Sequence, residues 1–242
     1  MTNAERQSIT QKAYELLLMM RPDTFPPDPC ALNLPDVFII SYGDYGRSMG
    51  ISPEKLSLSM RYPDAYCTKE VRPGVCLVLY NEACILPRQR YSIWHEIGHI
   101  TLGHTRCSVL QEREADFFAA QIMAPDAVIR LLQKGRKSIN AQLLCEVFGL
   151  SHAAAEAKLR ALYDCPQTVP AALENAVKSL FLPYIREQFP PLMLRKLRET
   201  LAFNEAVYGS PPSCEKNEYP RTGNGLLLFS APGEAEQYLS RH

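Results

Sequence analysis

The chain has 242 residues, enough for one large domain or two small ones with a buried core. Hydrophobic residues make up 46% and charged residues 21%, which is typical of a globular protein and not of a disordered or fibrous one. Lysine plus arginine and aspartate plus glutamate both total 26, so the net charge of zero gives no support for whole-protein attraction to nucleic acid or to an acidic membrane.

The N-terminal segment and the cysteines indicate the compartment. Charged residues interrupt the first twenty positions, and no apolar run approaches the ~20 residues that a membrane helix needs, so we expect neither a secretory signal nor a membrane span. The eight cysteines include no Cys-x-x-Cys pair, which argues against a zinc knuckle or a thioredoxin-type motif. We therefore expect a cytoplasmic protein whose cysteines are reduced thiols.

The first half of the chain mixes helix and strand patterns. Residues 4–20 carry apolar side chains at helical spacing, whereas the four prolines within 21–29 exclude a helix. Residues 37–43 and 75–81 are rich in Val, Ile, Leu and Tyr and are bounded by turn residues, so both are predicted strands.

The second half is predicted to be mainly helical. The expected helices are residues 91–103, 110–125, 126–135, the two halves of 139–163, and 171–206 with a break at 189–191. Gly103 should cap the first of these, Pro125 should stop the second, and Ser151 should cap the second half of 139–163. The resulting fold class is α+β.

The segment "WHEIGHITLGH" (Trp94–His104) holds three of the five histidines. His95 and His99 lie on one face of a helix, so both imidazoles can reach one point, and neutral imidazole is an ordinary zinc ligand. Glu96 lies about 100° around the helix from His95, where its carboxylate can take a proton from a water molecule. Two histidines and a glutamate are not expected in a helix that only packs in the core, because burying these polar groups without partners costs free energy. The H-E-x-x-H pattern therefore predicts a zinc site with Glu96 as base.

The third ligand must come from elsewhere. His104 lies beyond the expected helix end, and the extended pattern H-E-x-x-H-x-x-G-x-x-H requires histidine where the chain has Thr105, so we expect His104 to cap the helix or to support a ligand. In the next helix Glu112 and Asp116 share a face, so one can bind zinc while the other accepts the second N–H of a ligand histidine. Glu114 lies about 200° from Glu112 and should face elsewhere, although a solvated acidic face is the alternative for all three.

At this point the two segments "YSIWHEIGHITLGH" and "EREADFFAAQIMAP" resemble the ImmA/IrrE family of zinc metallo-endopeptidases. The pattern of that family's second helix is matched in order by Glu112, Ala115, Asp116, Phe118, Ala119, Met123 and Pro125. The resemblance covers roughly residues 75–165. It implies a zincin-like core over 1–125 with zinc as cofactor, His95, His99 and Glu112 as ligands and Glu96 as the catalytic base. The choice between Glu112 and Glu114 stays open on the residues alone.

The resemblance extends to residues 126–165, which look like the family's helix-turn-helix-like region. Beyond it, the residue pattern alone predicts further helices within 166–206 and a turn-rich tail over 207–242. The implied substrate is a helix-turn-helix transcriptional repressor whose cleavage relieves repression, with no direct binding of nucleic acid or membrane. Residues 75–81, just before the metal helix, are expected to offer a strand edge to an extended substrate.

The alternative function is a DNA-binding or protein-interaction regulator on a zincin fold with little or no peptidase activity. Residues 145–162 have the helix, glycine-containing turn and helix of a DNA reader. Their second helix offers only Lys158 and Arg160 as cations, so a packing role is favoured.

Overall fold

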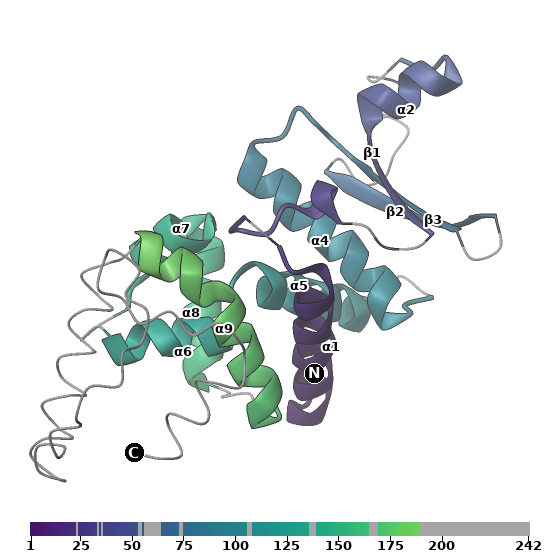
Figure 1. The fold of residues 1–242 in the computed structure, drawn as a ribbon. Coiled ribbons are helices and arrows are strands. Elements are labelled where there is room, and N and C mark those ends of the chain that lie inside the picture. Colours follow the sequence, from purple (N-terminus) through teal and green to yellow (C-terminus); the bar gives the residue numbers. More distant parts are fainter. Residues whose placement is uncertain are drawn as a thin grey trace, which may run out of the picture. The chain divides into compact units, whose positions relative to one another are not determined.

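The computed structural model describes residues 1–22, 24–32, 34, 36–52, 55, 64–72, 75–105, 108–135, 139–164 and 169–188. The chain divides into two compact units, residues 1–184 and 185–242, and the elements below belong to the first except for the last residues of α9. In chain order they are α1 (Asn3–Met20), the 3₁₀ turn η1 (Pro29–Ala31), β1 (Val37–Ser41), α2 (Tyr42–Met49), β2 (Ala65–Arg72), β3 (Val75–Tyr80), α4 (Leu86–Leu102), α5 (Val109–Met123), α6 (Asp126–Gly135), α7 (Ala141–Phe148), α8 (His152–Asp164) and α9 (Ala171–Gln188) (Figure 1).

The described strands form one mixed sheet in the order β1-β3-β2. β1 runs parallel to β3, with Val37 opposite Cys76, and β2 runs antiparallel to β3, with Cys67 opposite Val78. The expectation that residues 75–81 offer a strand edge to the substrate is wrong, because β3 is the central strand and pairs on both sides. The edge strand that lies against α4 is β2, which the sequence pattern did not predict.

Three helices are layered on this sheet and form the core. α4 lies against β2 and β3, α5 packs on α4, and α1 packs on α5 (Figure 1). The buried face of α4 consists of Ile93, Trp94 and Ile97, none of which is more than 1% exposed. The Trp94 indole N–H donates to the Pro27 carbonyl oxygen at 3.2 Å, so its one polar atom is satisfied within the core.

The helix ends follow the sequence signals with one difference. α4 begins at Leu86 and not near Tyr91, because Pro87 fits the first turn of a helix, where an N–H has no intrahelical partner. α4 ends as predicted at Gly103, which adopts the left-handed conformation with φ of 71°. α5 ends at Met123, two residues before Pro125.

The helices after α5 confirm the predicted segments within the described residues. α7 ends at Gly149, which is left-handed, and Ser151 caps α8 by accepting the N–H of Ala154 at 3.3 Å. An ion pair joins α8 to α6, with the Lys158 ammonium 2.8 Å from the Asp126 carboxylate and both side chains 5% exposed.

The C-terminal prediction is only partly covered by the described residues. α9 corresponds to the first helix expected within 171–206. The rest of that segment and the tail 207–242 lie outside the described residues. In the part of the chain that the structure describes, no helix has both the length and the apolar character needed to cross a membrane.

Candidate metal centre

Three side chains from α4 and α5 converge on one point. The Nε2 atoms of His95 and His99 lie 3.0 Å apart, and the Glu112 Oε2 atom is 3.2 Å from the former and 3.6 Å from the latter. Within the described residues these three form the group of histidine, cysteine and acidic side chains that could hold a metal ion. The structure thus brings together the three residues that the sequence predicted as ligands.

The helix packing that brings Glu112 to the histidines depends on a glycine. A methyl group at Gly98, between the two histidines on α4, would lie 3.1 Å from the Phe118 ring and 3.3 Å from the Ala115 backbone on α5. Such contacts are tighter than ordinary van der Waals packing, so a larger residue would push α5 away from α4. Gly98 therefore sets the distance across which the carboxylate reaches the histidines.

The outer nitrogen of His95 forms a hydrogen bond with Asp116 on α5. The Asp116 Oδ1 atom accepts from His95 Nδ1 at 2.8 Å and from the Tyr91 hydroxyl at 3.0 Å. Partial burial tends to raise the pKa of Asp116, but the hydrogen bonds from His95 and Tyr91 lower it below its ordinary value. Asp116 therefore remains an ionised acceptor behind His95, one turn along from Glu112, as its spacing predicted.

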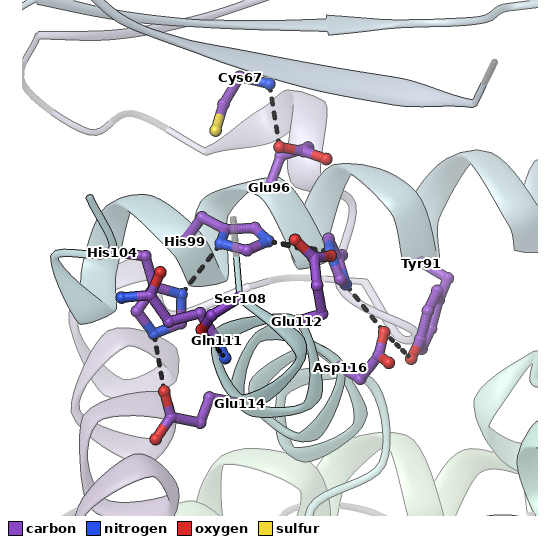
Figure 2. Close-up of polar contacts among 11 residues, drawn as sticks. Cys67, Tyr91, Glu96, His99, His104, Ser108, Gln111, Glu112, Glu114 and Asp116 are labelled. Atoms are coloured by element: carbon purple, nitrogen blue, oxygen red, sulfur yellow. Dashed lines mark hydrogen bonds and ion pairs between the residues drawn. The ribbon is translucent and has the colours of Figure 1, made fainter. Parts of the chain in front are cut away.

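The outer nitrogen of His99 has a different partner. His99 Nδ1 lies 2.9 Å from His104 Nδ1, and His104 Nε2 lies 3.1 Å from a Glu114 carboxylate oxygen (Figure 2). His104 is 6% exposed and lies between His99 and Glu114. The expectation that His104 supports a ligand fits this position, whereas the contact of Glu114 was not foreseen.

Glu96 follows His95 on α4, about 100° around the helix, and its carboxylate faces β2. The backbone N–H of Cys67 on β2 donates to Glu96 Oε2 at 2.9 Å, and the Cys67 side chain also forms a hydrogen bond with this carboxylate (Figure 2). Burial raises the pKa of Glu96, although the hydrogen bonds from Cys67 act in the opposite direction. Glu96 is thus a half-buried carboxylate that the edge strand holds beside the histidine pair.

A hollow of about 300 Å³ opens beside Glu96 and His95. Its walls include Ala65 on β2, and Arg88, Tyr91 and Ser92 on α4. Arg88 pairs with Asp64 at 2.7 Å at the rim, where the arginine side chain is 59% exposed. The hollow therefore lies between the edge strand and the first turns of α4, with His95 and Glu96 in its wall.

The donor set suits a catalytic metal. Two imidazoles and one carboxylate form a His₂Glu set, which is common in catalytic zinc sites. Residues 62–160 match the family model of the IrrE N-terminal-like domain, Peptidase M78. This segment is thus similar to the IrrE N-terminal-like domain, which confirms the resemblance seen in the sequence. The described helices and mixed sheet confirm the α+β class, and the His/His/Glu group could hold a metal ion. Searches of curated proteins and of solved structures gave no match.

Sequence reasoning missed two residues at this centre, Tyr91 and Cys67, and one contact, that of Glu114 with His104. Tyr91 is one helical turn before His95, and its spacing on α4 could have placed it on the same face. Cys67 comes from a strand that was not predicted, so no local signal indicated its contact with Glu96. Glu114 meets His104 only because α5 follows α4 closely in space.

Proposed function

We propose that the protein is a zinc-dependent endopeptidase in which His95, His99 and Glu112 hold the metal and Glu96 is the general base. The convergence of two imidazole nitrogens and one carboxylate oxygen beside the half-buried Glu96 carries this proposal. The IrrE N-terminal-like domain supports it, because that domain defines a family of peptidases. When bound, zinc supplies the Lewis acidity that activates a water molecule and polarises a peptide carbonyl.

Glu96 performs the proton transfers in this proposal. Its carboxylate takes a proton from the attacking water and then passes it to the amine that leaves when the peptide bond breaks. Burial raises the pKa of Glu96, which makes this carboxylate a stronger proton acceptor than an exposed glutamate and therefore better suited to take the proton from water. The N–H of Cys67 orients this carboxylate from the edge strand.

The edge strand β2 is the proposed docking edge for an extended substrate. Antiparallel pairing alternates, so the backbone groups of Ala65 point to the same side as the Cys67 N–H that meets Glu96. Ala65 also lines the hollow beside Glu96. A peptide that pairs along this edge brings one of its carbonyl groups to the metal centre and a side chain into the hollow.

A helix-turn-helix repressor is the proposed substrate, and its cleavage would relieve transcriptional repression. This part of the proposal rests on the resemblance to ImmA/IrrE peptidases. A cytoplasmic location belongs to the same proposal, and it fits the finding that none of the five described cysteines forms a disulfide.

The DNA-binding alternative loses its main support in the structure of α8. Lys158 is buried against Asp126, and Arg160 lies 3.9 Å from Glu156 on the same helix. A recognition helix needs exposed cations for phosphate and base contacts. With Lys158 buried, α8 has a packing role that favours the peptidase proposal.

The Glu96→Gln variant tests the proposal. Zinc content and cleavage of a purified helix-turn-helix repressor are measured for this variant and for Glu146→Gln, which changes an exposed glutamate on α7. Glu96→Gln should retain zinc and lose cleavage, because the amide cannot accept the proton, whereas Glu146→Gln should resemble the wild type. Full cleavage by Glu96→Gln would refute the mechanism.

A further inference from the structure

A row of three side chains extends from the metal centre to the surface of α5. His99 contacts His104 through their Nδ1 atoms at 2.9 Å, and His104 contacts Glu114 through its Nε2 atom at 3.1 Å (Figure 2). The exposed fraction of the side chain rises along the row beyond His99, from 7% at His104 to 17% at Glu114. A buried imidazole between another imidazole and a carboxylate has both nitrogens engaged, so its orientation is fixed.

The turn after α4 places His104 in this row. Gly103 takes the left-handed conformation, and the backbone N–H of His104 then returns to the carbonyl oxygen of His99 at 3.0 Å. The same two residues therefore contact each other through backbone and side chain. His104 is held against His99 by the helix cap, independently of Glu114.

The carboxylate at the end of the row determines where the protons lie. An ionised carboxylate only accepts hydrogen bonds, so His104 donates to Glu114 through Nε2–H. Neutral His104 then has a lone pair on Nδ1 and can only accept there, which makes His99 the donor through Nδ1–H. In that tautomer His99 has its Nε2 lone pair directed toward His95 and Glu112, where a metal needs it.

We infer that Glu114 and His104 are positioning residues that hold His99 in the tautomer and ring orientation required for metal binding. This role rests on the proposed function, in which His99 is a ligand. It parallels the role of Asp116 behind His95, but it uses an imidazole as an intermediate because the Glu114 carboxylate contacts His104 and not His99. Outer partners of ligand histidines typically change metal affinity about 10- to 100-fold when they are removed.

Two substitutions at His104 separate this role from simple packing. In His104→Asn the side-chain oxygen is bonded to Cγ, as Nδ1 is in histidine. It can therefore take the place of Nδ1 and still accept the His99 Nδ1–H. In His104→Leu the buried volume is filled but no acceptor remains. A packing role would favour leucine at this buried site, whereas a positioning role favours asparagine.

The experiment measures the affinity of the full chain for Zn²⁺ alone, by competition with a chromophoric chelator at one pH. The proteins are the wild type, His104→Asn, His104→Leu, Glu114→Ala, the double variant His104→Asn with Glu114→Ala, and the control Glu146→Ala. Circular dichroism of the metal-free proteins shows which of them are folded. The Glu114 side chain is more exposed than that of His104, so Glu114→Ala disturbs the packing less. It therefore tests the positioning role even if His104→Leu does not fold.

The inference predicts a specific pattern of affinities. His104→Leu and Glu114→Ala should bind Zn²⁺ about 10- to 100-fold more weakly than the wild type, and His104→Asn should stay within about threefold of it. Glu114→Ala should have almost no further effect in the His104→Asn background, because an amide oxygen is an acceptor whether or not Glu114 is present. Glu146→Ala should match the wild type.

Other results overturn the inference. The positioning role would be refuted if Glu114→Ala bound Zn²⁺ as tightly as the wild type, or if His104→Leu bound it more tightly than His104→Asn. It would also be refuted if Glu114→Ala had its full effect in the His104→Asn background. These results would leave the peptidase proposal intact, because the wild type would still bind Zn²⁺. A wild-type chain that binds no Zn²⁺ would refute the proposed function and the inference together.

Discussion

Replacing Gly98 with alanine should disturb the metal centre without touching a ligand. The new methyl group would stand 3.1 Å from the Phe118 ring and 3.3 Å from the Cα and carbonyl oxygen of Ala115. The phenyl ring can shift by a few tenths of an ångström, but the Ala115 backbone belongs to α5 and moves only with that helix. Because Glu112 is on the same helix, its carboxylate should move away from His95.

The magnitude follows from two opposing effects. Alanine is favoured over glycine within a helix by about 1 kcal/mol. Overpacking of a filled interface costs about 1–3 kcal/mol. The net change in the free energy of unfolding should therefore be a loss of about 0–2 kcal/mol.

Zinc binding should respond more strongly than stability. We expect Gly98→Ala to bind Zn²⁺ at least about tenfold more weakly, because metal ligands must meet their distances within a few tenths of an ångström. Urea unfolding of the metal-free protein gives the change in stability, and chelator competition gives the change in affinity. Combining Gly98→Ala with Phe118→Leu separates the two contacts: it relieves the contact with the ring but not the contact with the Ala115 backbone, so most of the loss of affinity should persist.

The opposite result would refute this reasoning. If Gly98→Ala stabilises the metal-free protein by about 1 kcal/mol and binds Zn²⁺ as the wild type does, then only helix propensity matters at this position. In that case the distance between α4 and α5 is not set by Gly98.

Three further predictions concern Asp116 at the metal centre and the buried ion pair of Lys158 and Asp126. Asp116→Ala should weaken Zn²⁺ binding about 10- to 100-fold in chelator competition, because His95 Nδ1–H loses its acceptor; unchanged affinity would contradict this. Lys158→Met should lower the free energy of unfolding in urea by about 3–5 kcal/mol, because it leaves the buried Asp126 without its partner; a loss below about 1 kcal/mol would show that the pair is not desolvated. Burial tends to raise the pKa of Asp126, but Lys158 and Gln121 hold it below its ordinary value, so the stabilisation from this carboxylate is complete above about pH 4 and is lost as the pH falls further. The difference in unfolding free energy between wild type and Asp126→Asn should accordingly shrink below about pH 4, and a difference that grows on acidification would reverse the sign of this argument.

Much of the centre could be predicted because its geometry is helical and local. The spacing of His95 and His99 places them on one face, and the spacing of Glu112 and Asp116 does the same on the next helix. α4 ends at Gly103 and α8 starts after Ser151, as the conformational preferences of glycine and serine indicate. Each of these features depends on residues within one or two helical turns.

The features that sequence reasoning missed depend on contacts between distant segments. β2 contains Lys69, Glu70 and Arg72, which weaken a strand signal, and its conformation depends on pairing with β3. The order β1-β3-β2 makes β3 the central strand, and no local pattern shows that a strand will be paired on both sides. Glu114 reaches His104 only once α5 has packed on α4.

Metal analysis of the purified wild type beside Glu112→Ala tests the central claim most directly. The account predicts about one zinc ion per chain in the wild type and a large loss in Glu112→Ala, since two histidines alone leave the site one protein ligand short. Retention of one zinc ion per chain by Glu112→Ala, or a wild type that takes up no zinc, would contradict the assignment of His95, His99 and Glu112 as the metal centre.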